Sequence, residues 1–168
     1  MNFEELIRER KSTRLFSGKE LEQDKIDKIL DAARVAPTAK NTQPFRIYVV
    51  KSSEGLEKID KCTPCRYKAP LVFLVCGDEN KSYIKNDKPM YEVDCSIVAT
   101  HMILEATYLG VDNIWVEYFD TNKAIEEFDL PNNIKPVCML PMGYKAKLCP
   151  PSPMHKMRKS VESFTEYR

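Results

Sequence analysis

The sequence predicts an α+β protein in which helices flank a small mixed central sheet, and three observations support this prediction. Helical and strand periodicities are mixed along the chain without strict βαβ alternation. The apolar run Leu71–Cys76 is typical of a central strand that is buried on both faces. The chain has 168 residues, of which 43% are hydrophobic, so it is long enough for a real core. We therefore expect residues 1–168 to form a single domain.

Apolar residues at helical spacing predict five helices, with Ser53 as the expected cap of the third. The predicted helices are Phe3–Ile7, Leu21–Val35, Ser53–Cys62, Val93–Leu109 and Asn122–Phe128. The fourth is apolar almost all round, which places it in the centre of the protein or between two subunits. His101 on this helix is expected to be a core residue rather than a base.

Runs of apolar and β-branched residues predict four strands. These are Phe45–Val50, Leu71–Cys76, Ile114–Phe119 and Val137–Met142. The charged segment Gly77–Met90 is expected to be a loop. The last part of the domain, about residues 144–168, contains three prolines and is expected to form a C-terminal arm that wraps over another surface.

The six cysteines do not indicate a disulfide framework, because several of them lie inside apolar segments and no secretion signal precedes them. Cys62 and Cys65 form a CxxC pair, which can be a redox pair or half of a metal site. No second CxxC completes a zinc site, so we expect no metal. Chance or a local structural role is the favoured interpretation of the pair, and a redox or metal-binding role is the alternative.

The stretch from Ala36 to Phe45 is unusually polar for a short connection between a helix and a strand. Prolines stand near both of its ends and restrict the backbone. The side chains between them are hydroxyls and carboxamides, which both donate and accept hydrogen bonds. These residues are Pro37, Thr38, Asn41, Thr42, Gln43 and Pro44. The stretch is either a rigid bend that reads the polar groups of a small molecule or an ordinary capped turn.

A second polar stretch, Arg10–Arg14, places three cations and a hydroxyl within five residues. Arg10, Lys11, Ser12 and Arg14 suit a phosphate, because guanidinium binds its oxygens in a fork and ammonium adds a point charge. A further cationic run, His155–Lys159, lies in the arm. The alternative interpretation of each run is a solvated basic surface.

Several classes of protein are excluded or disfavoured. The chain contains no G-x-G-x-x-G and no Walker loop, so no dinucleotide fold of the Rossmann type is predicted. A net charge of +1 does not indicate nucleic acid as a partner. No apolar run is long enough to span a membrane, and the acidic stretch Met1–Glu5 is unlike a secretion signal. We therefore expect a soluble cytoplasmic protein.

Taken together, these stretches resemble the signature motifs of the nitroreductase family, whose members are FMN-dependent NAD(P)H oxidoreductases. The resemblance begins with Arg10–Phe16 and Ala32–Phe45, continues through Asp94 and its helix to Gly110 and Trp115, and includes Leu140–Tyr144 and Arg158–Phe164. It therefore spans nearly the whole chain in order, and the paired N-terminal motifs are its most specific part.

The resemblance implies a homodimer with two FMN sites at the subunit interface. In these sites Arg10, Ser12 and Arg14 hold the phosphate and ribityl chain, Lys11 lies in the same motif, and Arg158 and Lys159 return to the phosphate. Pro37, Thr38, Asn41 and Gln43 would meet the flavin from the other subunit. NAD(P)H would be the electron donor and a nitroaromatic, quinone or similar small molecule the acceptor. Because the cofactor carries this chemistry, no side chain is predicted to be catalytic.

The sequence departs from the family pattern in three places. Val111-Asp112 stands where many members have a second glycine after the long helix, and Glu117 stands where a glycine often follows the Trp-x pair. The insertion that covers the flavin in larger members is missing. These departures leave two alternatives open: a protein that stores or senses FMN with little turnover, or an enzyme of the same fold that modifies flavin.

Overall fold

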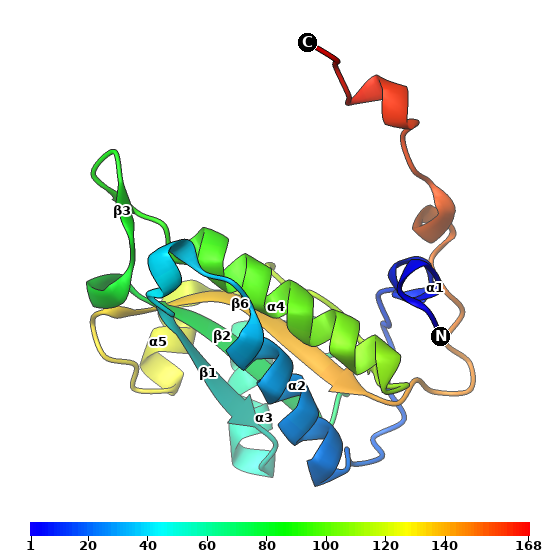
Figure 1. The fold of residues 1–168 in the computed structure, drawn as a ribbon. Helices are drawn as coiled ribbons and strands as arrows, with labels where there is room; N and C mark the ends of the chain where they lie inside the picture. The colour runs from blue at the N-terminus through cyan, green and yellow to red at the C-terminus, as the bar shows by residue number, and fades with distance from the viewer.

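The computed structural model describes all residues 1–168, and it is built in three layers (Figure 1). A four-stranded sheet lies in the middle, with strand order β1-β2-β6-β5. Helices α2 and α4 cover one face, and α3 and α5 cover the other. The helices are α1 (Phe3–Glu9), α2 (Gln23–Val35), α3 (Ser53–Cys62), α4 (Tyr91–Tyr108) and α5 (Thr121–Glu127). The strands are β1 (Phe45–Val50), β2 (Leu71–Asp78), β3 (Ile84–Lys85), β4 (Lys88–Pro89), β5 (Asp112–Asn113) and β6 (Ile134–Gly143).

Strand β2 is the centre of the core, and every one of its residues is buried. Because successive side chains of a strand point to opposite faces, β2 contributes side chains to two separate hydrophobic clusters, one on each face of the sheet. Leu71, Phe73 and Val75 pack with α2 and α4, whereas Val72 and Leu74 pack with α3 and α5. The predicted central strand and the α+β class are both confirmed.

The sheet is antiparallel rather than mixed. Its one parallel pairing is an isolated bridge between Ser12 and Asn113. The predicted strand Ile114–Phe119 is also wrong, since the ladder with β6 ends at Asn113 and resumes as a single bridge at Val116. Pro141 explains the break: its carbonyl accepts from the Ile114 N–H at 3.2 Å, but a proline has no N–H to donate in return.

The predicted loop Gly77–Met90 contains a small hairpin, β3–β4. Its two turn residues, Asn86 and Asp87, both have left-handed backbone angles, with φ of 51° and 61°. Such a two-residue turn matches the natural twist of a hairpin, and Asn and Asp tolerate it better than most residues. A further local difference is the cap of α3, which is Ser52 rather than Ser53.

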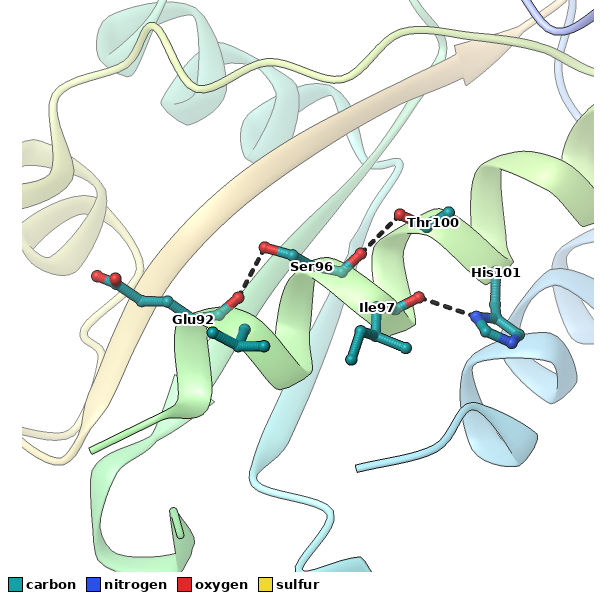
Figure 2. A pocket seen from close by; sticks show the side chains of 6 residues that line it. Glu92, Ser96, Ile97, Thr100 and His101 are labelled. Atoms are coloured by element: carbon teal, nitrogen blue, oxygen red, sulfur yellow. Dashed lines mark hydrogen bonds between the residues drawn. The ribbon is translucent and has the colours of Figure 1, made fainter. Parts of the chain in front are cut away.

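Helix α4 is buried on one side only. Its inner face packs in the core, while Figure 2 shows Ser96, Ile97, Thr100 and His101 on its other side. His101 therefore lies on the outward face and is not the core residue we predicted. The hydroxyls of Ser96 and Thr100 donate to carbonyls four residues earlier in the same helix, at 2.7 and 2.8 Å. The hydroxyl groups on this face are therefore already hydrogen-bonded to carbonyls of the same helix.

The chain leaves the body of the protein after β6, and the following residues extend past α1 (Figure 1). Tyr144 fixes the start of this arm: its hydroxyl donates to the Glu22 carboxylate and accepts from Lys25 Nζ. The hydrogen bond from Tyr144 and the Lys19 ammonium lower the pKa of Glu22 to about 2. None of the helices combines the length and the apolar content needed to cross a membrane.

Candidate functional site

The stretch Arg10–Arg14, called the basic segment below, follows α1. Asn113 joins this segment to the C-terminal end of α4. The Asn113 carbonyl accepts from the Thr13 N–H at 3.0 Å, which holds the segment in place. The Asn113 side chain is buried and donates to the Ile103 carbonyl and the Thr107 hydroxyl at 3.2 and 3.0 Å. Asp112 adds a second connection by accepting from the Thr13 hydroxyl at 3.2 Å. The position of the predicted phosphate-binding residues therefore depends on the C-terminal end of α4.

Five of the predicted site residues line one cavity of about 220 Å³. They are Arg10, Lys11, Ser12 and Arg14 from the basic segment and Arg158 from the arm. The arm also contributes Ser152, Met154 and His155, of which Ser152 and Met154 carry no signal in the sequence. Lys159 is exposed and does not line this cavity. The structure thus brings residues about 150 positions apart into one cationic pocket.

The positive charges of this pocket are not neutralised within the chain. No ion pair involves Arg10, Lys11, Arg14 or Arg158. Burial lowers the pKa of Arg10, and the positive charge of Arg158 lowers it further. Both effects destabilise the cationic form of Arg10. A dianion such as a phosphate monoester would stabilise the charged guanidinium groups and accept hydrogen bonds from them.

The polar stretch Ala36–Phe45, called the bend below, lies at the N-terminal end of α4. Its backbone is strained. Lys40, Asn41 and Gln43 all have left-handed backbone angles, with φ between 49° and 55°. Such angles are uncommon for residues other than glycine and cluster at functional sites. Thr38 holds the bend from inside, because its hydroxyl oxygen accepts from the Gln43 N–H at 3.0 Å. The carboxamides of Asn41 and Gln43 are exposed, and Gln43 Nε2 donates to Asn41 Oδ1 at 3.3 Å, so two hydrogen-bonding groups lie side by side.

Asp94 fastens this bend to the start of α4, a role that the sequence did not predict. Its side chain is buried, and Oδ1 accepts from the Ala39 N–H at 2.8 Å. From its position near the start of α4 alone, Asp94 would be no more than a favourable negative charge at a helix N-terminus. Two buried oxygens in this region, Asp94 Oδ2 and Thr42 Oγ1, have no partner within the chain. Because buried polar atoms are normally paired, these two are typical of a region that another molecule completes.

The two polar regions do not meet within one chain. The bend is bonded to α4 at Asp94 and the basic segment is connected to it near Thr107. At 1.5 Å per residue these two points of the helix are about 20 Å apart. The bend and the arm accordingly lie towards opposite ends of α4 in Figure 1. A single ligand that contacts both regions therefore needs them from two different chains.

Comparison with known proteins identifies the fold and the family. The model of the nitroreductase family matches residues 7–63 and 64–144. The chain belongs to the nitroreductase family. It is 32% identical over 154 residues to a Methanothermobacter thermautotrophicus protein assigned to the NADH dehydrogenases/NAD(P)H nitroreductases, covering 88% of this chain and 79% of that protein.

Two further similarities bear on the fold and on the flavin. A solved structure of a nitroreductase family protein from Clostridium difficile superimposes with a TM-score of 0.93 at 41% identity, covering 99% of this chain and 98% of the other. The FMN reductase [NAD(P)H] of Bacillus subtilis is 24% identical over 160 residues, covering 83% of this chain and 64% of that protein. The first match extends across the arm as well as the body.

Two of the three departures from the nitroreductase pattern place carboxylates that make local hydrogen bonds in this chain. Asp112, in place of a glycine, accepts from the Lys145 N–H at 2.9 Å as well as from Thr13, so it joins the basic segment to the start of the arm. Glu117, also in place of a glycine, accepts from the Trp115 indole N–H at 3.0 Å. Both carboxylates are therefore engaged in local contacts.

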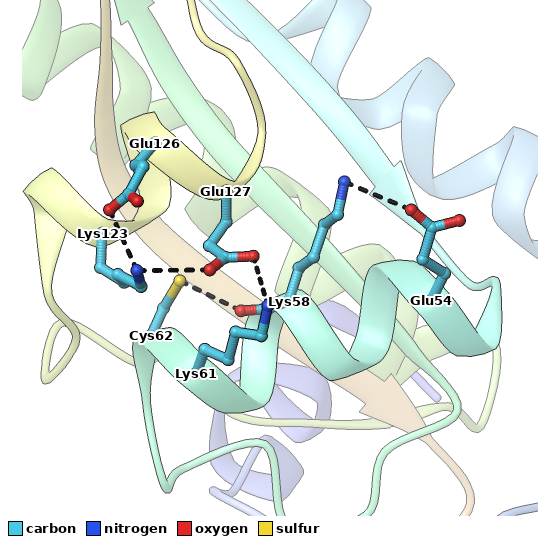
Figure 3. A network of polar contacts seen from close by, with 7 residues as sticks. All are labelled: Glu54, Lys58, Lys61, Cys62, Lys123, Glu126 and Glu127. Carbon is cyan, nitrogen blue, oxygen red and sulfur yellow. Dashed lines mark hydrogen bonds and ion pairs between the residues drawn. The ribbon is translucent and has the colours of Figure 1, made fainter.

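The cysteine pair at the C-terminal end of α3 fits the local structural interpretation. Cys62 is buried, its thiol donates to the Lys58 carbonyl at 3.2 Å, and burial raises its pKa above the ordinary value. Figure 3 shows it beside a polar network in which one ion pair, Lys61 with Glu127 at 2.9 Å, joins α3 to α5. A thiol with a raised pKa is a poor redox nucleophile. No group of three or more potential ligands that could hold a metal ion is present.

The Asp94 connection can be tested without any ligand. Asp94→Ala should remove the acceptor of the partly buried Ala39 N–H and destabilise the protein by about 1 kcal/mol, the usual net contribution of one hydrogen bond. Hydrogen exchange of the peptide 36–45 should become faster, while β2 stays protected. Asp94→Asn keeps an oxygen at the Oδ1 position and is the matched control. Equal exchange of the bend in wild type and Asp94→Ala would contradict this role.

Proposed function

We propose that this protein is an FMN-dependent oxidoreductase that uses NAD(P)H to reduce small electron-poor molecules such as nitroaromatics or quinones. Membership of the nitroreductase family makes it an NAD(P)H-dependent flavin oxidoreductase. The observation that carries the choice of FMN is the cationic pocket, which gathers unpaired charges around a space suited to one terminal phosphate. The absence of Rossmann glycines disfavours FAD, whose pyrophosphate such glycines accommodate.

In this proposal the pocket residues hold the phosphate end of the cofactor. Arg10 lines the pocket from the basic segment and Arg158 from the arm, and Ser12 adds a hydroxyl to the lining. Lys11 and Arg14 add positive charge to the lining, and the exposed Lys159 adds charge further along the arm. When bound, FMN would supply the redox chemistry by accepting hydride from NAD(P)H and delivering electrons to the acceptor.

The bend would meet the ring system from a second subunit. Asn41 and Gln43 are exposed, adjacent and able to donate or accept, so they suit the polar edge of a flavin or its ribityl hydroxyls. Pro37 and Thr38 limit the freedom of the bend before a ligand arrives. FMN joins its phosphate to its ring through a five-carbon chain, which does not bridge opposite ends of α4. A homodimer brings the pocket of one chain to the bend of the other.

The surface of the chain supports such a homodimer. The outward face of α4 exposes Val93 and Tyr108, while its hydroxyls are already bonded to the helix backbone and lose little on leaving water. The arm exposes apolar side chains along its length, including Leu148, Phe164 and Tyr167. An arm of this kind gains stability by lying on a partner subunit. The single domain of residues 1–168 would thus be completed only in the dimer.

The missing family glycines favour the alternative of a protein that stores or senses FMN. Measuring turnover distinguishes that alternative from the proposed enzyme. Flavin-loaded protein should oxidise NADH or NADPH repeatedly when a quinone or nitroaromatic is added. One flavin reduction without further turnover would support the storage alternative. A changed flavin product, detected by chromatography of the released cofactor, would instead support a flavin-modifying enzyme. The location in the cytoplasm stays a prediction.

The phosphate role of Arg10 predicts a ligand-specific loss. Arg10→Ala should weaken FMN binding roughly ten- to hundredfold, because a charge-assisted hydrogen bond contributes about 1.5–3 kcal/mol. Riboflavin, which lacks the phosphate, should lose much less affinity on the same substitution. Titrations of both ligands into apoprotein measure the difference. Lys68→Ala is a suitable control, since this exposed lysine lies outside the pocket. Equal losses for both ligands would rule out a phosphate contact.

A mixed dimer tests whether the two halves of the site come from different chains. One chain carries Arg10→Ala and the other carries Asn41→Ala with Gln43→Ala. If each site combines the pocket of one chain with the bend of the other, the mixed dimer has one intact site and one doubly defective site. Tandem-tag purification followed by FMN titration should then recover wild-type affinity at half the stoichiometry.

The parent variants provide the reference, because neither homodimer contains an intact site. If pocket and bend served the same flavin from a single chain, every site in the mixed dimer would keep one defect. Weak binding at full stoichiometry would therefore contradict the shared site. A monomeric mass by light scattering, with FMN bound, would contradict it as well.

A further inference from the structure

The β3–β4 hairpin stands directly beside the polar bend. Lys40, in the middle of the bend, holds its ammonium 4.8 Å from the centre of the Tyr83 ring at the base of the hairpin. On the near side of the hairpin, the Asp78 N–H donates to the Pro44 carbonyl at 2.9 Å. On the far side, Met90 directly precedes α4, the helix that holds the bend through Asp94. The hairpin and the bend therefore form one continuous surface.

The pleat of the hairpin decides which side chains face the bend. Lys85 pairs with Lys88 across the ladder, so both side chains point to the same face. Tyr83 lies two residues before Lys85 and shares that face, and the Met90 N–H bonds to its carbonyl at 2.9 Å. Since Tyr83 contacts Lys40, the face that carries Lys85 and Lys88 is the one turned towards the bend.

This face carries positive charge that nothing in the chain neutralises. Lys40, Lys85 and Lys88 take part in no ion pair, whereas Lys81 at the base is paired with Asp78 at 3.8 Å. Asp87 sits at the tip of the turn and forms no ion pair either. Like charges directly opposite each other in a hairpin are destabilising. The arrangement becomes favourable once an anion lies between the ammonium groups.

We propose that Lys40, Lys85 and Lys88 form a cationic rim beside the acceptor site and select acceptors that carry a carboxylate or sulfonate. The inference rests on the proposed function, because it assumes that the bend meets the flavin and that acceptors bind next to it. The preferred substrates are then flat, electron-poor aromatic acids rather than neutral or cationic aromatics. Exposed ammonium groups act here as point charges, so the preference is electrostatic and sensitive to salt.

The test compares two nearly isosteric acceptors, para-nitrobenzoate and para-nitrobenzamide, with flavin-loaded protein. The measured quantity is the ratio of their kcat/KM values, in which general effects of a substitution cancel. Lys85→Gln combined with Lys88→Gln should lower the ratio roughly three- to tenfold, as expected for two exposed charges. Lys85→Arg with Lys88→Arg keeps the charge and should preserve the ratio. Raising the salt concentration should shrink the wild-type preference.

Lys68→Gln is the control for a general change of charge. Lys68 is exposed and precedes the start of β2, whereas the hairpin follows its end, about 25 Å away along the strand. Its removal should leave the ratio unchanged. If para-nitrobenzamide is turned over normally and the kcat/KM ratio is the same in wild type and Lys85→Gln/Lys88→Gln, the proposed cationic rim is wrong. The lysines would then serve only to discourage pairing at the edge of the hairpin. No turnover of either acceptor by wild type would overturn the proposed function and the rim together.

Discussion

Helix α4 is the constraint on which the rest of the site depends, because both polar regions of the chain are bonded to it. Asp94 near its start holds the bend, and Asn113 connects the basic segment to its last turns. The helix packs on the sheet along its inner face, so its direction and length are set by the core. The two regions are consequently held apart at a fixed distance. In the proposed homodimer, each chain would therefore supply two half-sites rather than one complete site.

Each half-site is locally unfavourable in a way that the surrounding structure tolerates. The pocket gathers four cations without a carboxylate among its lining residues. The bend keeps three non-glycine residues in left-handed backbone conformations, each of which costs on the order of 1–3 kcal/mol. A buried core and the Asp94 hydrogen bond hold these features in place. Unrelieved charge at one site and strain at the other are both typical of surfaces that are organised for a ligand.

Most of the fold followed from local patterns, and the errors have identifiable causes. The uninterrupted apolar run of β2 predicted a central strand correctly, since burial on both faces leaves no polar positions. The strand expected at Ile114–Phe119 was wrong because the break depends on Pro141 in a distant partner strand. The β3–β4 hairpin was missed because Asn-Asp is a weaker turn signal than Asn-Gly, and its strands are only two residues long.

By itself, the sequence determined the family, the central strand and the two polar stretches, because their signals lie in short runs of neighbouring residues. It also contained Arg158, but only the folded arm placed this residue in the same cavity as Arg10. The tertiary structure alone decided that Asp94 supports the bend, that His101 faces outward, and that the pocket and the bend lie at opposite ends of α4. The physical reason is that a side chain's partner across the fold depends on how helices and strands pack, which local periodicity does not encode.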